Sequence, residues 1–153
     1  MSVIKMSAEI REHPEALERI LEEGWDAILA AARVLRRDGL RSVMIAARGT
    51  SDNAALYAKY LFEVLLGVPA ALASPSSFTL YESRMNLDGV LVVGISQSGE
   101  SQDVLETIRR SGELGADTLS VTNDEGSAMA QVAQHHLFLR AGRTRWPCPG
   151  PFP

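Results

Sequence analysis

The stretch VLVVGISQSGES, residues 90–101, decides the fold. Its first six residues form an apolar run, which is typical of a strand covered on both faces of a parallel sheet. Val104, Leu105 and Ile108 then recur at helical spacing, so we expect a helix to begin just after the serines. The stretch therefore predicts a buried strand that leads through a serine-rich loop into a helix.

This serine loop is suited to binding a phosphate group. A helix N-terminus presents unpaired N–H groups and about half a positive charge, and serine hydroxyls add neutral hydrogen-bond donors. Ser96, Ser98 and Ser101 place three hydroxyls within six residues, which is more than one helix cap uses. The loop predicts phosphate binding without a metal. The alternative is that the serines only cap the helix.

Two known catalytic motifs nearly fit the same loop. The phosphate loop of nucleoside triphosphatases, G-x-x-x-x-G-K-[ST], needs a lysine where this chain has Glu100, so the charge is reversed and we exclude that class. The nucleophile elbow of serine hydrolases, G-x-S-x-G, needs a glycine in place of Ser98. A serine hydrolase that uses His135 or His136 stays an alternative.

Another strand, loop and helix of the same kind lie earlier in the chain, before residue 90. Residues 42–47, SVMIAA, are apolar like a short strand and lead into Arg48, Gly49, Thr50 and Ser51. The helical pattern that follows predicts a buried stripe, which is formed by Leu56, Tyr60, Leu61, Val64 and Leu65.

The rest of the chain continues this alternation. Residues 118–122 predict a strand, and its acidic loop at 123–127 is interpreted as an ordinary turn and helix cap. The other expected elements are a strand from Val68, helices at about 80–86, 103–114 and 128–133, and a strand at 137–140.

Strands that alternate with helices predict a parallel sheet with helices on both faces. We expect a doubly wound three-layer α/β/α fold of about five parallel strands in the flavodoxin-like order 2-1-3-4-5. Ligands bind such sheets where the winding reverses, here between the first and third strands, so the loops at 48–51 and 96–101 would face one crevice. A nucleotide-binding Rossmann half is the competing sheet, but its G-x-G-x-x-G fingerprint is absent.

Composition indicates one domain and excludes several partners. The 153 residues suit a single domain, and the net charge of -4 arises from scattered charges of both signs, so we expect no nucleic-acid or membrane surface. We find no signal peptide or spanning apolar run, and the single cysteine, Cys148, has no internal partner, which together indicate a cytoplasmic protein. His13, His135 and His136 lack the spacing of a metal site and are interpreted as structural. No metal or other cofactor is expected.

A known family carries the same pair of loops. RGTS and SQSGES, with the strand end TLSVTN, resemble the sugar isomerase (SIS) domain family over about residues 6–142. The opening MSAEIREHP is similar to the segment that leads into the isomerase half of glucosamine-6-phosphate synthases. The stretch ARGTSDNAALYAKYLFE is more similar to stand-alone proteins with two SIS domains, such as aminosugar-phosphate deaminases, and Arg48 stands where the synthases have cysteine.

The resemblance implies a hexose or hexosamine 6-phosphate as ligand. We also expect a homodimer, formed through the apolar N-terminal helix or through the helix at 54–66. The resemblance places the phosphate on Ser96, Gln97, Ser98 and Ser101, and the sugar near Gly49, Thr50 and Ser51.

Catalysis is left open by the sequence. Family members of this type carry a second SIS domain that supplies a catalytic glutamate and lysine and a histidine for ring opening, and none of that follows here. Glu100 is the one candidate base in the serine loop, and its expected role is instead to complement the helix dipole. We expect phosphosugar binding by part of an isomerase, deaminase or aminotransferase-like enzyme, with a noncatalytic phosphosugar sensor as the alternative.

We divide the chain into a helical segment at 1–38, a SIS domain at 39–142 that is the first of two, and an irregular tail at 143–153. The tail, RTRWPCPGPFP, is rich in proline, and we interpret it as the product of a frameshift or truncation, the alternative being a proline-rich partner-binding tail. The helical segment presents an apolar stripe of Leu17, Ile20, Leu21, Ile28, Ala31 and Val34 or Leu35.

Overall fold

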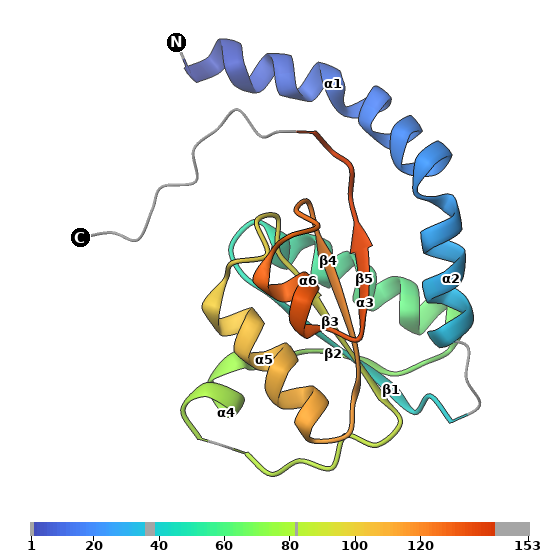
Figure 1. The fold of residues 1–153 in the computed structure, drawn as a ribbon, viewed down its shortest axis with the longest axis vertical. Coiled ribbons are helices and arrows are strands. Elements are labelled where there is room, and N and C mark those ends of the chain that lie inside the picture. The colour runs from blue at the N-terminus through green and yellow to red at the C-terminus, as the bar shows by residue number, and fades with distance from the viewer. Residues whose placement is uncertain (1, 36–38, 82, 143–153) are drawn as a thin grey trace.

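Five parallel strands form one sheet in the order β2-β1-β3-β4-β5 in the computed structural model of the chain (Figure 1). The structure describes residues 2–35, 39–81 and 83–142. Each neighbouring pair of strands is parallel, so the predicted doubly wound α/β fold and its strand order are confirmed. The strands are β1 (Ser42–Ala47), β2 (Ala70–Leu72), β3 (Val90–Ile95), β4 (Asp117–Thr122) and β5 (His135–Phe138).

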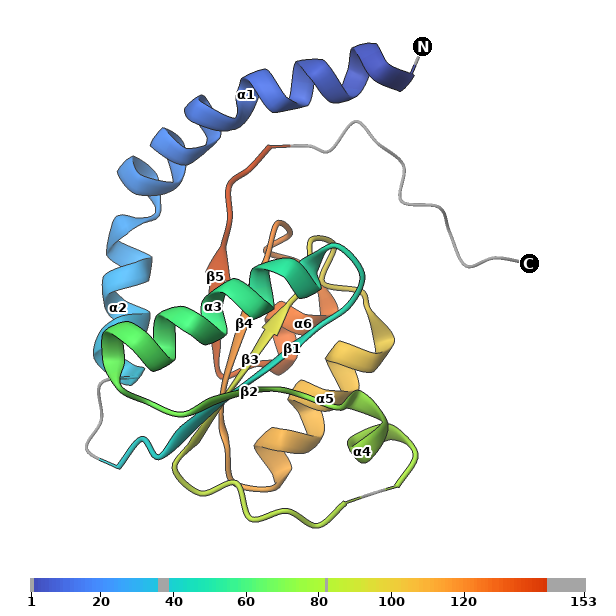
Figure 2. The same ribbon diagram turned by 180° about the vertical axis from the view of Figure 1, so that it is seen from behind.

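The helices of the described residues are α1 (Ser2–Glu23), α2 (Trp25–Leu35), α3 (Ser51–Leu66), α4 (Pro75–Thr79), α5 (Gln102–Glu113) and α6 (Ala128–Val132). Helix α3 covers one face of the sheet, and α4, α5 and α6 cover the other (Figures 1 and 2). Helix α2 contacts β5, whereas α1 continues beyond α2 and extends away from the sheet. The three layers that the alternation predicted are therefore present.

The strands are buried on both faces because successive side chains alternate between the two helical layers. Ile45 packs on the α3 side, while Val92 packs with Ile108 of α5 on the other. At Gly94, a β-carbon would come within 2.8 Å of both Ile108 and Met129. Glycine at this position thus lets α5 and α6 approach β3 closely.

Helix α3 contacts the sheet through a different face from the predicted one. Ala55 is buried, and Ala58 and Phe62 pack against the same core cluster. The small alanines let the helix backbone approach the branched side chains of β1 and β3, which already fill this layer. The predicted buried stripe is therefore wrong: the exposed fraction is 46% for Leu56, 57% for Tyr60, 38% for Leu61, 76% for Val64 and 71% for Leu65.

The N-terminal helical segment consists of two helices, which meet at Gly24, rather than one. The last turns of α1 are held by the chain that follows β5. Arg19 Nε donates a hydrogen bond of 3.1 Å to the Arg140 carbonyl, and the Arg140 guanidinium lies 3.4 Å from the Glu23 carboxylate. The predicted apolar stripe on α1 is not buried: Leu17 and Leu21 are 60% and 57% exposed.

The helix predicted at 80–86 is wrong, because the helix of this region lies earlier in the chain. Pro75 occupies the first turn of α4, where its fixed φ and missing N–H favour a helix start, and Phe78 is its buried contact. The amides of Leu80 and Tyr81 both donate to the Ser76 carbonyl, which ends the helix. Three strand starts also differ from expectation: β2 begins at Ala70 and β5 at His135, each two residues away, and β4 begins one residue early at Asp117.

The tail at 143–153 lies outside the described residues, so its interpretation stays a prediction, as do the boundaries of the three segments. In the parts of the chain that the structure describes, no helix combines the length and apolar character needed to span a bilayer.

Candidate functional site

The loops after β1, β3 and β4 leave the sheet at one edge. Ala47 pairs with Ile95 and Ile95 pairs with Val121, so the three strands end at nearly the same level. Arg48 and Ser96, the next residues of β1 and β3, therefore start their loops side by side. This is the point where the strand order reverses, the place where open α/β sheets bind ligands.

The serine loop is folded around its own hydroxyl groups. Ser96 Oγ accepts a hydrogen bond of 3.2 Å from the Gly99 amide, and Ser98 Oγ accepts one of 3.3 Å from the Glu100 amide. Ser96 is buried, whereas Ser98 is exposed at the edge of the sheet. A hydroxyl that accepts one bond keeps its own proton for donation. Both serines can therefore donate to an anion without breaking the loop.

Helix capping accounts for only part of the hydroxyls at this edge. Ser101 and Thr50 occupy the N-cap positions of α5 and α3, yet neither side chain makes a capping hydrogen bond. Ser127 caps α6 by accepting the Ala130 amide at 3.3 Å. The interpretation of the β4 loop as a turn and cap agrees with this bond. In contrast, the hydroxyls of Ser101 and Thr50 remain available to a ligand.

The backbone of the serine loop is attached to the next loop and to α6. The Gln97 carbonyl accepts the Asn123 amide at 2.9 Å, and the Gly99 carbonyl accepts the Met129 amide at 3.2 Å. The Asn123 side chain in turn accepts the Ala141 amide at 2.8 Å. These bonds hold the loop in one shape. The sequence placed Asn123 only in the loop after β4 and gave no sign of these contacts, because its partners Gln97 and Ala141 lie far along the chain.

Glu100 complements a helix dipole, although not that of its own helix. Its Oε1 accepts the backbone amide of Ala128 over 3.0 Å, at the first residue of α6. A carboxylate at that place satisfies an unpaired N–H and favours the positive end of the helix. Glu100 thus connects the serine loop to α6.

The β1 loop approaches α5 through an ion pair. Gly49 adopts a positive φ of 62°, and its carbonyl accepts the Asp52 amide at 3.1 Å at the start of α3. Arg48 Nη2 lies 2.9 Å from Asp103 Oδ2 in the first turn of α5. Sequence spacing offers no signal for this contact, which depends on the pairing of β1 with β3.

The histidines of β5 lie in the sheet and not in the serine loop. His136 Nδ1 is 2.9 Å from Ser120 Oγ, on the adjacent strand β4. The described partner of Ser96 Oγ is the Gly99 amide, so Ser96 and His136 do not form a nucleophile and base pair. Within the described residues, no group of three or more histidine, cysteine, aspartate or glutamate side chains is placed to hold a metal ion.

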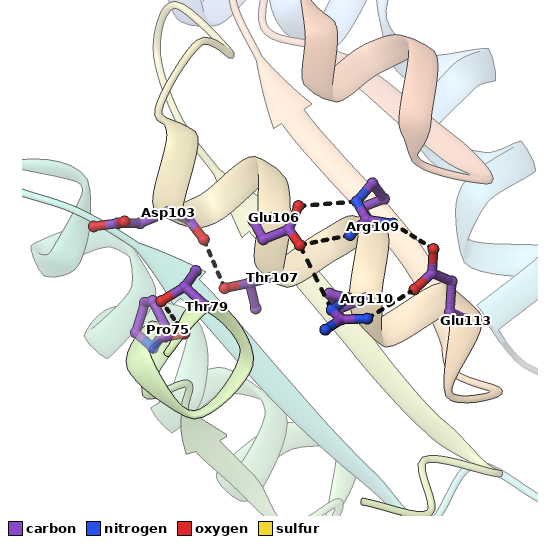
Figure 3. Close-up of polar contacts among 8 residues, drawn as sticks. All are labelled: Pro75, Thr79, Asp103, Glu106, Thr107, Arg109, Arg110 and Glu113. Carbon is purple, nitrogen blue, oxygen red and sulfur yellow. Dashed lines mark hydrogen bonds and ion pairs between the residues drawn. The ribbon is translucent and has the colours of Figure 1, made fainter. Parts of the chain in front are cut away.

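Helix α5 carries a network of charges on its later turns (Figure 3). Arg109 Nε donates to Glu106 Oε2 over 2.8 Å, and Arg110 lies 3.6 Å from the same carboxylate. The hydrogen bond from Arg109 lowers the pKa of Glu106 below its ordinary value, and the positive charges of both arginines add to that effect. The network stabilises the later turns of α5, away from its N-terminus.

A cavity of about 200 Å³ lies at the C-terminal end of α5. It is lined by Phe78, Ser83, Arg84, Arg110, Glu113 and Leu114.

Together, the fold and its loops define an open, doubly wound α/β protein with hydroxyl-rich loops at the reversal of strand order. The SIS domain model matches residues 39–148, and the chain belongs to the SIS domain family. The family membership predicted from the two loops is confirmed.

Two curated relatives are glutamine–fructose-6-phosphate aminotransferases (isomerizing). The one from Methanothermobacter thermautotrophicus is 39% identical over 137 residues, which cover 90% of this chain and 22% of the relative. The one from Halobacterium salinarum is 39% identical over 145 residues, which cover 90% of this chain and 24% of the relative. The chain therefore spans about a quarter of the length of these relatives.

Solved structures show the same likeness. A protein from Silicibacter pomeroyi, provisionally assigned as a phosphosugar isomerase, superposes with a TM-score of 0.88 at 39% identity, over 91% of this chain and 42% of that one. The C-terminal domain of glucosamine-fructose-6-phosphate aminotransferase from Francisella tularensis superposes with a TM-score of 0.74 at 29% identity, over 92% and 40% of the two chains. The chain is thus a SIS phosphosugar isomerase-like domain, related to the isomerase part of those aminotransferases.

Proposed function

We propose that this chain binds a hexose or hexosamine 6-phosphate, such as fructose 6-phosphate or glucosamine 6-phosphate, at the edge formed by its β1 and β3 loops. The observation that carries the proposal is the set of uncapped hydroxyls at the N-termini of α3 and α5. The named substrate of the aminotransferase relatives, fructose 6-phosphate, belongs to the same class of ligand.

In the proposed complex, the phosphate lies at the N-terminus of α5. The hydroxyls of Ser96, Ser98 and Ser101 donate to its oxygens, and the Gln97 side chain adds a further polar group. Gly49, Thr50 and Ser51 lie near the sugar. Because these donors are neutral, the serine loop itself contributes hydrogen-bond geometry and the helix dipole to phosphate recognition.

The chemistry of the bound sugar is a separate question, and we propose that this chain contributes the binding. Glu100, the carboxylate of the serine loop, accepts a hydrogen bond from the Ala128 amide through Oε1. A general base must lie within hydrogen-bond reach of the proton that it removes. We therefore propose that catalysis by the isomerase, deaminase or aminotransferase type of enzyme needs groups beyond this loop. The same engagement of Glu100 favours a noncatalytic phosphosugar sensor as the second candidate.

We also propose that the chain forms a homodimer through its exposed apolar helices. The outer face of α3 presents Tyr57, Val64 and Leu65, which are 66%, 76% and 71% exposed. Large contiguous apolar surfaces of this kind are typical of interfaces. Lys59 and Glu63, on the same helix, pair with each other at 3.0 Å, so their charges do not oppose self-association. A cytoplasmic location stays a prediction.

Titration calorimetry with fructose 6-phosphate and glucosamine 6-phosphate tests the function. We expect Ser98→Ala to weaken binding about 10- to 100-fold, because a hydrogen bond to a charged group contributes about 1.5 to 3 kcal/mol. The matched control is Ser42→Ala, at the start of β1 on the opposite edge of the sheet, which should bind as the wild type does. Equal affinity for fructose and for its phosphate would contradict the proposal.

A further inference from the structure

The Arg48–Asp103 ion pair joins the two loops that meet where the strand order reverses. Arg48 follows β1 directly, and Asp103 lies two residues after Ser101, the N-cap of α5. The distance of 2.9 Å between Arg48 Nη2 and Asp103 Oδ2 places the guanidinium beside the first turn of α5. This is the place where the proposed function puts the phosphate.

The charges of the two loops make this cation significant. The two segments 48–53 and 96–103 together contain three acidic side chains, Asp52, Glu100 and Asp103. Arg48 is the single basic residue in them. A phosphate monoester carries about -1.5 to -2 charges near neutral pH, so carboxylates beside it would repel it. Neutral hydroxyls do not offset that repulsion, whereas the positive charge of a guanidinium offsets part of it.

The pair is also arranged so that Arg48 can exchange partners. Its side chain is 61% exposed and that of Asp103 is 45% exposed, and an ion pair in such a place contributes little to folding. Within the described part of the chain, the guanidinium makes no other hydrogen bond or ion pair. Its remaining N–H groups form a planar fork that matches a phosphate group.

We propose that Arg48 is a ligand-binding residue of this site, which contacts the phosphate of the bound sugar, and that Asp103 orients the guanidinium over the N-terminus of α5. The inference rests on the proposed phosphosugar function. In the absence of ligand, Asp103 neutralises Arg48 and keeps it beside the serine loop. In the complex, the phosphate takes over hydrogen bonds from the guanidinium, while the carboxylate remains close enough to limit its rotation.

Calorimetry on five proteins tests this assignment: the wild type, Arg48→Gln, Arg48→Lys, Asp103→Asn and the double variant Arg48→Gln with Asp103→Asn. The probes are glucosamine 6-phosphate and inorganic phosphate. We expect Arg48→Gln to bind both probes at least about tenfold more weakly. Arg48→Lys should recover part of the loss, because it keeps the charge but not the fork. Asp103→Asn should bind as tightly as the wild type or more tightly, because its amide oxygen can still accept a hydrogen bond from the guanidinium while a negative charge is removed.

Several results would overturn the inference. If Arg48→Gln binds both probes like the wild type, Arg48 does not contact the phosphate. If Arg48→Gln and Asp103→Asn lose affinity equally, and the double variant loses no more than either, the pair only joins the two loops. A loss confined to glucosamine 6-phosphate would assign Arg48 to the sugar and contradict the phosphate contact. Failure of the wild type to bind glucosamine 6-phosphate would overturn the proposed function itself, and this inference with it.

Discussion

Gly99 packs directly against Ser127: a β-carbon built on Gly99 would lie 2.3 Å from Ser127 Oγ and 2.4 Å from Ser127 Cβ. The contact joins the serine loop to the residue that caps α6. Gly99 also has a φ of 67°, in the left-handed region that residues with a side chain rarely adopt. The shape of the loop thus depends on a glycine for two independent reasons.

Gly99→Ala should destabilise the protein far more than Gly49→Ala. Both positions have a left-handed φ, which costs about 1 to 2 kcal/mol for a residue with a β-carbon. A β-carbon at Gly49 meets no atom within 4 Å, whereas at Gly99 it collides with Ser127. Overpacking adds about 1 to 3 kcal/mol, so we expect a total loss of about 2 to 5 kcal/mol for Gly99→Ala. Urea unfolding of the two variants measures the difference, and equal losses would show that the collision relaxes without cost.

Glu100→Ala should lower stability by about 1 kcal/mol, because it removes the carboxylate that accepts the Ala128 amide at the start of α6. Glu100→Gln keeps an oxygen acceptor and should lose less. Both variants should still bind glucosamine 6-phosphate, as shown by calorimetry. A stability unchanged in Glu100→Ala would contradict the structural role.

The Glu106 carboxylate should stabilise the fold at neutral pH and lose this effect in acid. The Arg109 hydrogen bond lowers the pKa of Glu106 in the folded protein below its ordinary value of 4.5. A group whose folded pKa is lowered contributes stability above its unfolded pKa, and the contribution disappears as the pH falls through the folded pKa. Glu106→Gln should therefore be less stable than the wild type at pH 7, and the difference should shrink below about pH 4.5.

Chemical unfolding at a series of pH values measures this effect. The control is Glu125→Gln, since the Glu125 side chain is exposed and makes no ion pair or hydrogen bond among the described residues. Its stability should follow that of the wild type at every pH. A difference between Glu106→Gln and the wild type that does not change with pH would contradict the assignment.

Val64→Glu should convert the proposed dimer to a monomer if α3 forms the interface. Val64 is 76% exposed, so a glutamate there does not disturb the core but places a charge in an apolar contact. Leu17→Glu makes the same change on α1, where the side chain is 60% exposed. Light scattering after gel filtration distinguishes the two helices, because only the variant at the true interface dissociates. A monomeric wild type at micromolar concentration would rule out both.

The parts of the fold that the sequence predicted correctly depend on local pattern and on the type of sheet. The β3 strand has apolar residues on both sides, so its burial does not depend on which way the sheet faces. The parallel sheet followed from the alternation of strands and helices, and its order was expected from the flavodoxin-like type of doubly wound sheet. The positions of the two hydroxyl-rich loops at one edge followed from that order.

The errors share a cause. Nearly every turn of α3 carries large apolar residues, so its pattern does not specify a single buried face, and Ala55 rather than Leu56 proved to contact the sheet. The segment at 80–86 contains apolar residues but follows a helix that Pro75 starts earlier. In both places the local pattern fitted more than one arrangement, and packing selected between them.

The sequence by itself determined the α/β class, the family and the two loops, because these depend on periodicity and on short motifs. Only the tertiary structure decided which groups meet across the loops. Arg48 contacts Asp103 because β1 and β3 are neighbouring strands. Glu100 contacts Ala128 because β4 pairs with β3, so that α6, which follows β4, begins beside the serine loop. Such contacts depend on the positions of whole elements in space, and residues 55 and 28 positions apart in the chain carry no local signal of them.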